Sequence, residues 1–222
     1  MQRFFDFFFS SLGLIFLSPL LLLIIIILKI SGEGEIFYLQ DRVGKDGNFF
    51  KLFKFATMLK NSPNMGTGTL TLKDDPRILP FGIFLRKTKI NELPQLINIF
   101  KGDMSIIGPR PQTKRCFDAF PEVSKEAIKK VKPGLSGIGS IFFRNEESMY
   151  PENCDYDDFY NQKIMFFKGR LEEWYVSNNN LLNYFLFIFI TLKVLLFPKI
   201  KFIWKIYKDL PLPPKELEKW FE

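Results

Sequence analysis

The longest uncharged run of this 222-residue chain lies near its beginning and limits the fold most strongly. No Asp, Glu, Lys or Arg occurs from Phe7 to Leu28. About 20 consecutive apolar residues are enough for a helix to cross the hydrocarbon core of a bilayer. A signal peptide is the rival interpretation, but the run is long for one and no small-x-small cleavage site follows it. The segment is therefore predicted to remain in the mature protein as a membrane segment.

Ser18 and Pro19 interrupt this apolar run. Proline removes a backbone donor and clashes with the preceding turn, so it kinks a helix. Two structures are compatible with the break: a kinked spanning helix, and a re-entrant hairpin that returns to the face from which it entered. Composition by itself favours the span. Charged residues stand on both sides of the run, so the positive-inside rule gives no orientation.

The composition narrows the classes of function. The net charge of +7 suits nucleic acid, an anionic membrane surface or phosphorylated substrates. The 27 Phe and 47% hydrophobic residues favour the last two and argue against nucleic acid. Cys116 and Cys154 lie far apart, which argues against a zinc site or a disulfide framework. The chain has no His, so acid–base chemistry and metal binding fall to Asp, Glu, Lys or Tyr.

The middle of the chain alternates polar and apolar segments. Two aromatic runs around "GKDGN" predict a β-hairpin, and "NSPNMGTGTLTLKDDPR" predicts a polar loop. "INELPQLINIFKG" predicts a helix that ends at Gly102, with an apolar face made by Leu93, Leu96, Ile97 and Phe100. "SIIGPRPQ" predicts an extended loop, and "PEVSKEAIKKV" a short helix that ends before Pro133. "KPGLSGIGSIFFRNEES" predicts a Gly-rich turn followed by a strand.

The tail from residue 179 begins with an apolar stretch that Lys193 interrupts. A Lys inside a lipid-exposed span is costly. Lysines then alternate with aromatic residues, a pattern typical of helices that lie in the membrane interface. A second transmembrane helix is the alternative.

Several residues of the polar part suit the binding of phosphate oxygens. Guanidinium groups, glycine turns and a helix N-terminus favour oxyanions, although any one Arg is more often a surface or ion-pair residue. With no His, a divalent cation needs Asp or Glu oxygens, which suits Mg²⁺ on a diphosphate. The candidates are Arg86, Lys87, Lys89, Glu92, Arg110, Arg144 and the close-approach glycines Gly134, Gly137 and Gly139.

The segments "FYLQDRVGKDGNFFKLFKFATM", "DPRILPFGIFLRK", "NELPQLINIFKGDMSIIGPRP" and "VKPGLSGIGSIFFRN" follow one another in order. They resemble the bacterial sugar transferases, the monotopic polyprenyl-phosphate phosphoglycosyl transferases. The resemblance extends from Arg3 to about Leu196. Such enzymes transfer a sugar 1-phosphate from a UDP-sugar to polyprenyl (undecaprenyl) phosphate and release UMP. This is the first membrane step of surface-glycan assembly.

The resemblance implies an α/β fold with a mostly helical, membrane-associated head and short strands. Residues 1–30 would form a re-entrant membrane hairpin broken at Ser18 and Pro19, which reverses the preference for a span. Residues 31–178 would form the cytosolic catalytic head, and residues 179–222 interfacial amphipathic helices and a tail, all within one functional domain. The expected location is the cytoplasmic face of the bacterial inner membrane. The expected partners are a UDP-sugar, polyprenyl phosphate, membrane lipid and downstream glycosyltransferases, and no nucleic acid.

The resemblance also assigns roles to residues. In the family, Asp-Glu precedes "LPQL"; the Asp is the nucleophile and the Glu belongs to the Mg²⁺ site. Glu92 matches that Glu, while Asn91 stands in place of the Asp. Arg86 and Arg110 match phosphate-binding residues, with Lys87 and Arg144 as further candidates. A later family carboxylate falls on Glu172.

Asn91 is the most consequential departure from the family pattern, and Ala56 and Ser140 also depart from it. An amide is a poor nucleophile, and losing a nucleophile costs roughly 10³ to 10⁶ in rate. Three explanations are compatible with Asn91: an active variant using Glu92, Glu172 or direct attack by the lipid phosphate, an introduced substitution that traps the enzyme, and a non-catalytic binding or scaffold protein. Asn is also a good helix N-cap, which would explain position 91 structurally.

Overall fold

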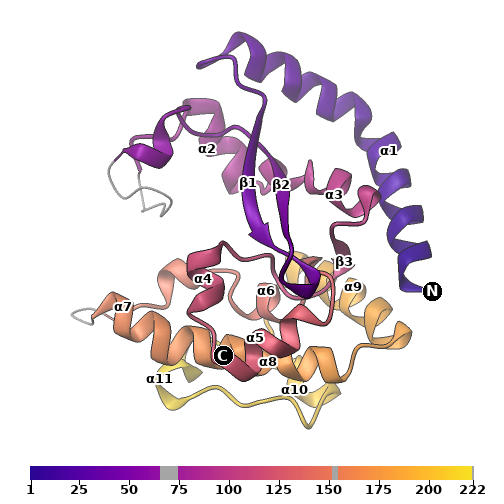
Figure 1. The fold of residues 1–222 in the computed structure, drawn as a ribbon, viewed down its shortest axis with the longest axis vertical. Helices are drawn as coiled ribbons and strands as arrows, with labels where there is room; N and C mark the ends of the chain where they lie inside the picture. Colours follow the sequence, from indigo (N-terminus) through magenta and orange to yellow (C-terminus); the bar gives the residue numbers. More distant parts are fainter. Residues whose placement is uncertain (66–74, 152–154, 222) are drawn as a thin grey trace. The chain divides into compact units, whose positions relative to one another are not determined.

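The computed structural model describes residues 1–65, 75–151 and 155–221. These residues are mostly helical and include two small two-stranded sheets, as expected for a helical head with short strands (Figure 1). The chain forms two compact units. The first unit comprises residues 1–6, 41–50 and 102–222, and the second comprises residues 7–40 and 51–101. The predicted division at residues 30 and 178 follows other criteria and stays a prediction.

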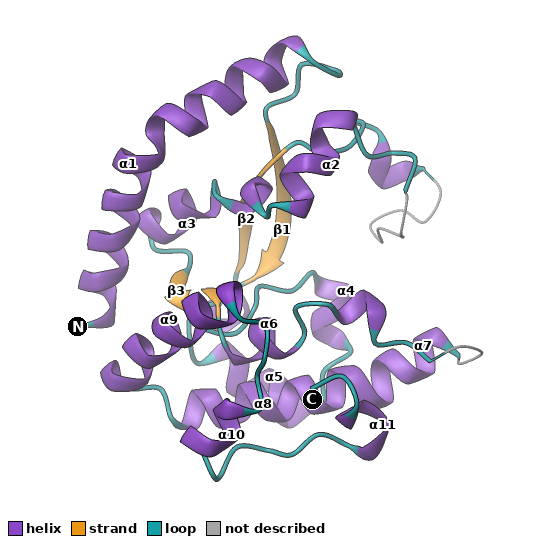
Figure 2. Ribbon diagram, turned by 180° about the vertical axis from the view of Figure 1, so that it is seen from behind, coloured by secondary structure: helices purple, strands orange, loops and turns teal. Residues whose placement is uncertain are grey.

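Helices and strands appear in the following order, coloured by type in Figure 2. The strands are β1 (Phe37–Val43), β2 (Phe49–Phe55), β3 (Ser105–Ile107) and β4 (Gly134–Ser136). The helices are α1 (Gln2–Ile30), α2 (Pro80–Lys87), α3 (Gln95–Lys101), α4 (Lys114–Asp118), α5 (Glu122–Lys129), α6 (Ile138–Phe142), α7 (Tyr156–Phe159), α8 (Met165–Ser177), α9 (Leu181–Leu196), α10 (Phe202–Ile206) and α11 (Lys215–Glu218). Short 3₁₀ turns are η1 (Lys45–Gly47), η2 (Ser62–Asn64), η3 (Ile90–Glu92) and η4 (Glu146–Ser148), and a π-helical turn, η5 (Tyr160–Ile164), precedes α8.

Helix α1 is one helix of 29 residues with Pro19 inside it. The Ser18 hydroxyl donates to the Ile15 carbonyl at 2.7 Å, so this side chain bonds the turn before the proline. Both ribbon views show α1 curving along its length (Figures 1 and 2). The predicted break at Ser18 and Pro19 therefore takes the form of a bend within a continuous helix rather than two separate legs.

Helix α1 is long and apolar enough to cross a membrane. Most of its large apolar side chains are exposed, and Ile15 and Phe16 are 69% and 74% exposed. An apolar surface of this extent marks a membrane or protein contact. Only a narrow side is buried, where Ile24 and Leu28 pack with Phe55 and Leu85 to form the core of the second unit.

The predicted hairpin around "GKDGN" is confirmed as β1 and β2, joined through η1. In η1 the left-handed conformation at Asp46 (φ 58°) and Gly47 (φ 77°) reverses the chain. The Asn98 side chain of α3 then extends β2 like a further strand. Its amide donates to the Lys51 carbonyl at 2.7 Å, and its oxygen accepts from the Phe53 N–H at 2.9 Å.

Helix α3 ends before Gly102 (φ 97°), as predicted, but its expected buried face is wrong. The buried positions are Gln95, Asn98 and Ile99. Phe100 from the predicted apolar stripe is instead exposed, and it stacks on Phe7 of α1 at 4.9 Å between ring centroids. The helix is so short that a paired polar face can point inward while its apolar side meets α1.

The predicted polar loop after β2 is partly outside the described residues, because residues 66–74 fall there. Its described ends meet at a buried ion pair between Arg77 and Asp75, with Nη2 and Oδ2 2.6 Å apart. The Arg77 guanidinium also donates to the carbonyls of Ser62 and Met65 at 2.8 and 2.7 Å. Arg77 therefore holds both ends of the loop together.

The first unit is built around α8 and α9, whose aromatic side chains supply much of its core. Phe187 and Tyr207 stack at 5.6 Å, and Trp174 meets Tyr207 edge-on at 4.9 Å. Helix α5 is confirmed and packs closely on α8, where Gly169 leaves room for Ser124. Cys116 is a free cysteine, whereas Cys154 lies outside the described residues.

Two predictions in this unit are wrong. Residues after the Gly-rich turn form helix α6 rather than a strand, since Ile138, Ile141 and Phe142 bury one face against the core. The extended stretch before the Gly-Pro-Arg-Pro loop contains β3, which pairs in parallel with β4 through Ser105 opposite Gly134. Neither three-residue strand shows enough alternation to be recognised in the sequence.

The tail forms α9, α10 and α11. Helix α9 buries Tyr184, Phe187 and Ile190 and exposes a stripe that includes Leu182 and Phe189. The Lys193 ammonium lies 3.8 Å from the ring centroid of Phe202, a cation–π contact that joins α9 to α10. The tail beyond is held to α8 by the Trp174 indole N–H, which donates to Asp209 at 2.8 Å.

Candidate functional site

The Asn91–Glu92 pair lies in the 3₁₀ turn η3 of the second unit. The turn is entered through Lys89, whose left-handed backbone (φ 59°) costs a non-glycine residue roughly 1–2 kcal/mol. The prediction that Asn91 is an N-cap is wrong, because Lys89 holds that position and no side chain caps the turn. Asn91 is 8% exposed, and its Oδ1 has no hydrogen-bond partner among the described residues. Its carbonyl oxygen is therefore available to a ligand.

Glu92 meets a lysine that the sequence did not single out. The Lys54 ammonium on β2 lies 3.3 Å from Glu92 Oε1, and both side chains are largely buried, at 18% and 16% exposed. Arg86, near the end of α2, donates to the hydroxyl of Thr57 at 3.5 Å. Helix α2 comes this near because Gly82 has no side chain to collide with the backbone of Thr57. Lys87 is exposed at the end of the same helix.

Residues of this cluster fit Mg²⁺ only in part. Magnesium prefers octahedral oxygen ligands and is often held by one or two carboxylates together with waters and substrate phosphates. Glu92 supplies one carboxylate, and the unpartnered Oδ1 of Asn91 supplies a neighbouring neutral oxygen. Within the described ranges, no group of three or more His, Cys, Asp or Glu side chains gathers. The cluster therefore suits a metal that substrate phosphates help to hold, not a closed protein cage.

Glu172 lies in α8 of the first unit and is 1% exposed. Its Oε2 finds no hydrogen-bond partner in the part of the chain that the structure describes. Burial raises the pKa of Glu172 to about 7, against the opposing effects of Lys168 and of the hydrogen bond from the Arg110 backbone N–H. A carboxyl group with this pKa exchanges a proton near neutral pH, as general acids and bases do.

Glycines bring the surrounding backbone close. A Cβ on Gly139 would collide with Glu172 Oε1, and a Cβ on Gly137 would collide with the Gly108 carbonyl. The Gly134 N–H donates to the Pro109 carbonyl at 2.7 Å. The close approach predicted at these glycines is therefore present, but it brings protein segments together around the Gly-Pro-Arg-Pro loop.

Arg144 is exposed and donates to the Val194 carbonyl at 3.0 Å, in the last turn of α9. A cation there complements the negative end of the helix. In this structure Arg144 has a structural partner, and its predicted role in phosphate binding stays a prediction.

The predicted site residues thus fall into two groups. Arg86, Asn91 and Glu92 come together in the second unit, while Arg110 and Glu172 come together in the first. Sequence reasoning missed Lys54, Thr57 and Lys168. Lys54 had a recognisable signal, since it is a cation within the predicted phenylalanine-rich strand "FFKLFKF". Thr57 and Lys168 had none.

Comparison with known proteins was decisive for the family. The sequence matches the bacterial sugar transferase family over residues 1–198. The chain belongs to this family. Among its relatives is the exopolysaccharide production protein ExoY of Sinorhizobium fredii, 37% identical over 72% of this chain and 76% of that protein. The undecaprenyl-phosphate galactose phosphotransferase of Salmonella typhimurium is 34% identical over 88% of this chain but only 40% of its own length.

A third relative of this bacterial sugar transferase is the putative undecaprenyl-phosphate N-acetylgalactosaminyl 1-phosphate transferase of Bacillus subtilis. It is 41% identical over 50% of this chain and 62% of that protein. The relatives' names differ in the sugar, and several share undecaprenyl phosphate. The resemblance identified from the motifs is therefore confirmed at the level of the family.

Proposed function

We propose that this bacterial sugar transferase transfers a sugar 1-phosphate from a UDP-sugar to polyprenyl phosphate and releases UMP. The observation that carries the proposal is the cluster of Glu92, Lys54 and Arg86 beside the buried Asn91, in a chain that matches the family almost throughout. Relatives named undecaprenyl-phosphate galactose and glucose phosphotransferases support the lipid acceptor and the sugar donor.

The transfer breaks the bond from the β-phosphorus of the nucleotide sugar to the bridging oxygen, which leaves with UMP. A new bond forms between that phosphorus and an oxygen of the acceptor phosphate. Asn91 is neutral and supplies no carboxylate nucleophile, so we propose that the lipid phosphate attacks directly. The protein then contributes positioning and charge. Arg86 and Lys54 hold phosphate oxygens, with Lys87 and Arg110 as further phosphate ligands, while Glu172 holds or releases a proton near neutral pH.

Mg²⁺ is part of the proposal. Glu92 and the amide oxygen of Asn91 would hold it, and it would neutralise charge on the diphosphate of the donor. Lys54 already pairs with Glu92, so metal and lysine share one carboxylate.

We also propose that α1 is inserted in the bacterial inner membrane as a re-entrant segment, which keeps both units on the cytoplasmic face. The exposed apolar surface of α1 and its bend at Pro19 support this arrangement. Helices α9 and α10 would lie in the interface, since Leu182, Phe189 and Leu196 are exposed along α9. Downstream glycosyltransferases would take the lipid-linked product.

The activity is tested by UMP release with Mg²⁺, polyprenyl phosphate and a panel of UDP-sugars. The chain as written is compared with Asn91→Asp and with Asn64→Asp, a control at an exposed asparagine. Turnover by the chain as written supports direct attack. Activity only in Asn91→Asp would indicate an enzyme trapped by this substitution, and no activity in either would overturn the proposal. The alternative of a non-catalytic protein rests on Asn91 alone, and the relatives' names do not support it.

The membrane arrangement is tested separately by cysteine labelling in a background lacking Cys116 and Cys154. One cysteine is inserted after Met1, and the other replaces Asn48, which is exposed in the loop after η1. A re-entrant α1 predicts that both cysteines are labelled only from the cytoplasmic side. Labelling of the first from outside the cell would mean that α1 spans the membrane.

A further inference from the structure

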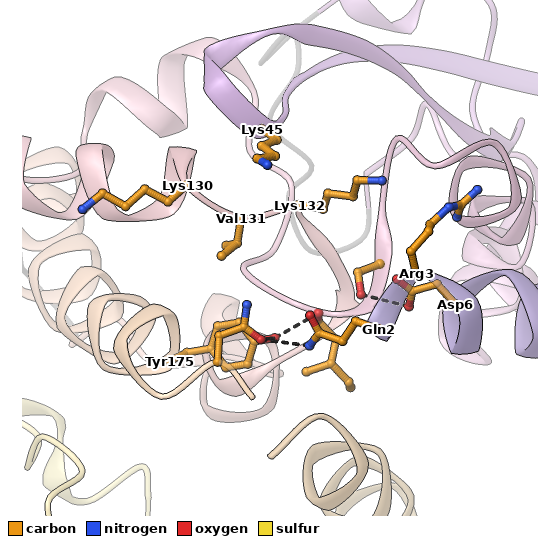
Figure 3. A pocket seen from close by; sticks show the side chains of 11 residues that line it. Gln2, Arg3, Asp6, Lys45, Lys130, Val131, Lys132 and Tyr175 are labelled. Carbon is orange, nitrogen blue, oxygen red and sulfur yellow. Dashed lines mark hydrogen bonds between the residues drawn. The ribbon is translucent and has the colours of Figure 1, made fainter. Parts of the chain in front are cut away.

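A cavity of ≈ 220 Å³ lies in the first unit, away from the residues that the sequence nominated for chemistry. Figure 3 shows the side chains that line it. They come from the first turn of α1, from η1, from β3, from the segment after α5 and from α8. Its charged lining residues are four cations and one carboxylate, namely Arg3, Lys45, Lys130, Lys132 and Asp6.

Two of these cations converge beside Gly102. The position of a Cβ on that glycine would lie 3.1 Å from Arg3 Nη2 and 3.4 Å from Lys132 Nζ. Gly102 has a φ of 97°, so the position favours glycine on backbone grounds as well. Burial, then Arg3, lowers the pKa of Lys132, and Lys45 acts in the same direction. Like charges held this near one another are stabilised by an anion between them.

The nearby carboxylates offset this charge only partly. Asp6 is buried, and its Oδ1 already accepts from the Ser105 hydroxyl, the Ile106 N–H and the Tyr184 hydroxyl, each at 2.9 Å. Asp103 acts on Lys132 from outside the lining. Neutral donors thus bind Asp6 on the side facing β3 and α9, and the cavity stays rich in cations.

The cations of the cavity do not all point the same way. In Figure 3 the ammonium of Lys132 extends toward Arg3, with Lys45 above, whereas Lys130 extends away from the others. Gln2 closes the far side, where its amide donates to Asn179 at 2.9 Å. Three cations from three separate segments therefore define one binding region.

We propose that this cavity binds the phosphate group of a phosphomonoester or diphosphate, held by Arg3, Lys45 and Lys132. A phosphate carries up to two charges and several acceptor oxygens, which matches a guanidinium and two ammonium groups better than a single carboxylate does. Arg3 stands in the first turn of α1, directly before the apolar segment. A lipid headgroup and a soluble phosphate compound are the two possible sources.

The site uses none of the residues assigned to the transfer reaction, so it does not depend on the proposed function. It is tested by binding in the full-length protein, without UDP-sugar and without turnover. The protein is placed in phosphatidylcholine nanodiscs and titrated with inorganic pyrophosphate by calorimetry. In a second arm, phosphatidic acid is added to the nanodiscs and the thermal unfolding temperature is measured.

Lys132→Gln is the diagnostic variant, and Lys130→Gln is its matched control, with the same loss of charge two residues away. Loss of one charge-assisted contact is expected to weaken pyrophosphate binding about tenfold in Lys132→Gln and to leave Lys130→Gln unchanged. Lys132→Arg is expected to retain binding. Lys45→Gln, a change at an exposed lysine, is expected to weaken binding several-fold and guards against misfolding of Lys132→Gln.

The two arms distinguish the sources. Pyrophosphate binding that depends on Lys132 assigns the site to soluble phosphates, and stabilisation by phosphatidic acid that depends on Lys132 assigns it to a lipid headgroup. Equal behaviour of Lys132→Gln, Lys45→Gln and Lys130→Gln in both arms would overturn the proposal.

Discussion

The backbone N–H of Arg110 donates a hydrogen bond to the carboxylate of Glu172. This contact joins the Gly-Pro-Arg-Pro loop to helix α8 within the first unit. Glu172 is nearly inaccessible to solvent, and Lys168 is the cation that acts on it. The loop is thereby fixed by a carboxyl group whose own charge depends on pH near neutrality.

Glu172 is expected to make stability depend on pH. Its pKa is about 7 when folded and near 4.5 when solvent-exposed, because burial disfavours the charged form. Between these values unfolding releases a proton, so the free energy of unfolding falls as pH rises from the lower value to the higher. The expected loss is on the order of 3 kcal/mol, at about 1.36 kcal/mol per pH unit, with no further loss above pH ~7.

The measurement is thermal unfolding across this pH range for the natural chain and for Glu172→Gln. Because Gln does not titrate, the difference between the two curves isolates Glu172. A difference that is independent of pH would mean that the buried carboxyl group keeps an ordinary pKa.

Gly139→Ala is expected to destabilise the first unit by about 1–3 kcal/mol, because its new Cβ would collide with the Glu172 carboxylate. The cost should shrink by about 1 kcal/mol or more when Glu172→Ala is also present, since the colliding atoms are then gone. A double-mutant cycle on the free energy of unfolding measures this coupling. Additive effects of the two changes would contradict the contact.

Asn98→Ala is expected to cost about 2–4 kcal/mol, because it strips partners from the Phe53 N–H and the Lys51 carbonyl. Asn64→Ala serves as the control, since that asparagine is exposed and should change stability by less than about 0.5 kcal/mol. Chemical denaturation compares the two variants. Similar stabilities would show that the amide of Asn98 is dispensable to β2.

Lys54→Gln is expected to strengthen divalent-cation binding at Glu92, because the lysine competes for the same carboxylate. Removing that charge should tighten the affinity for Mn²⁺, used as a spectroscopic substitute for Mg²⁺, by about fivefold. Titration followed by electron paramagnetic resonance gives the affinity. Lys51→Gln on the same strand should behave like the natural chain, and an equal gain in it would point to net charge alone.

Local patterns in the sequence predicted several elements correctly. The turn residues of "GKDGN" fix the β1–β2 hairpin, and Gly102 ends α3, because both effects depend on backbone conformation at one or two residues. The long apolar run predicted α1, since no arrangement of charged neighbours could bury so much apolar surface in water. The family motifs located Arg86, Glu92, Arg110 and Glu172.

Other features depended on partners that are distant in the sequence. Helix α6 replaces the predicted strand because its short apolar segment finds a core that buries a helical face. The buried side of α3 is polar because Asn98 pairs with β2, which no periodicity within α3 reveals. Lys54 becomes a site residue because its strand comes near Glu92.

The sequence by itself determined the membrane segment, the hairpin and the family, because each is written in consecutive residues. Only the tertiary structure decided that the Oδ1 of Asn91 is buried without a described partner, that Glu172 has a pKa near neutrality, and that Arg3 meets Lys132 in one cavity. Burial and charge are set by groups far along the chain, so these properties exist only once the chain has folded.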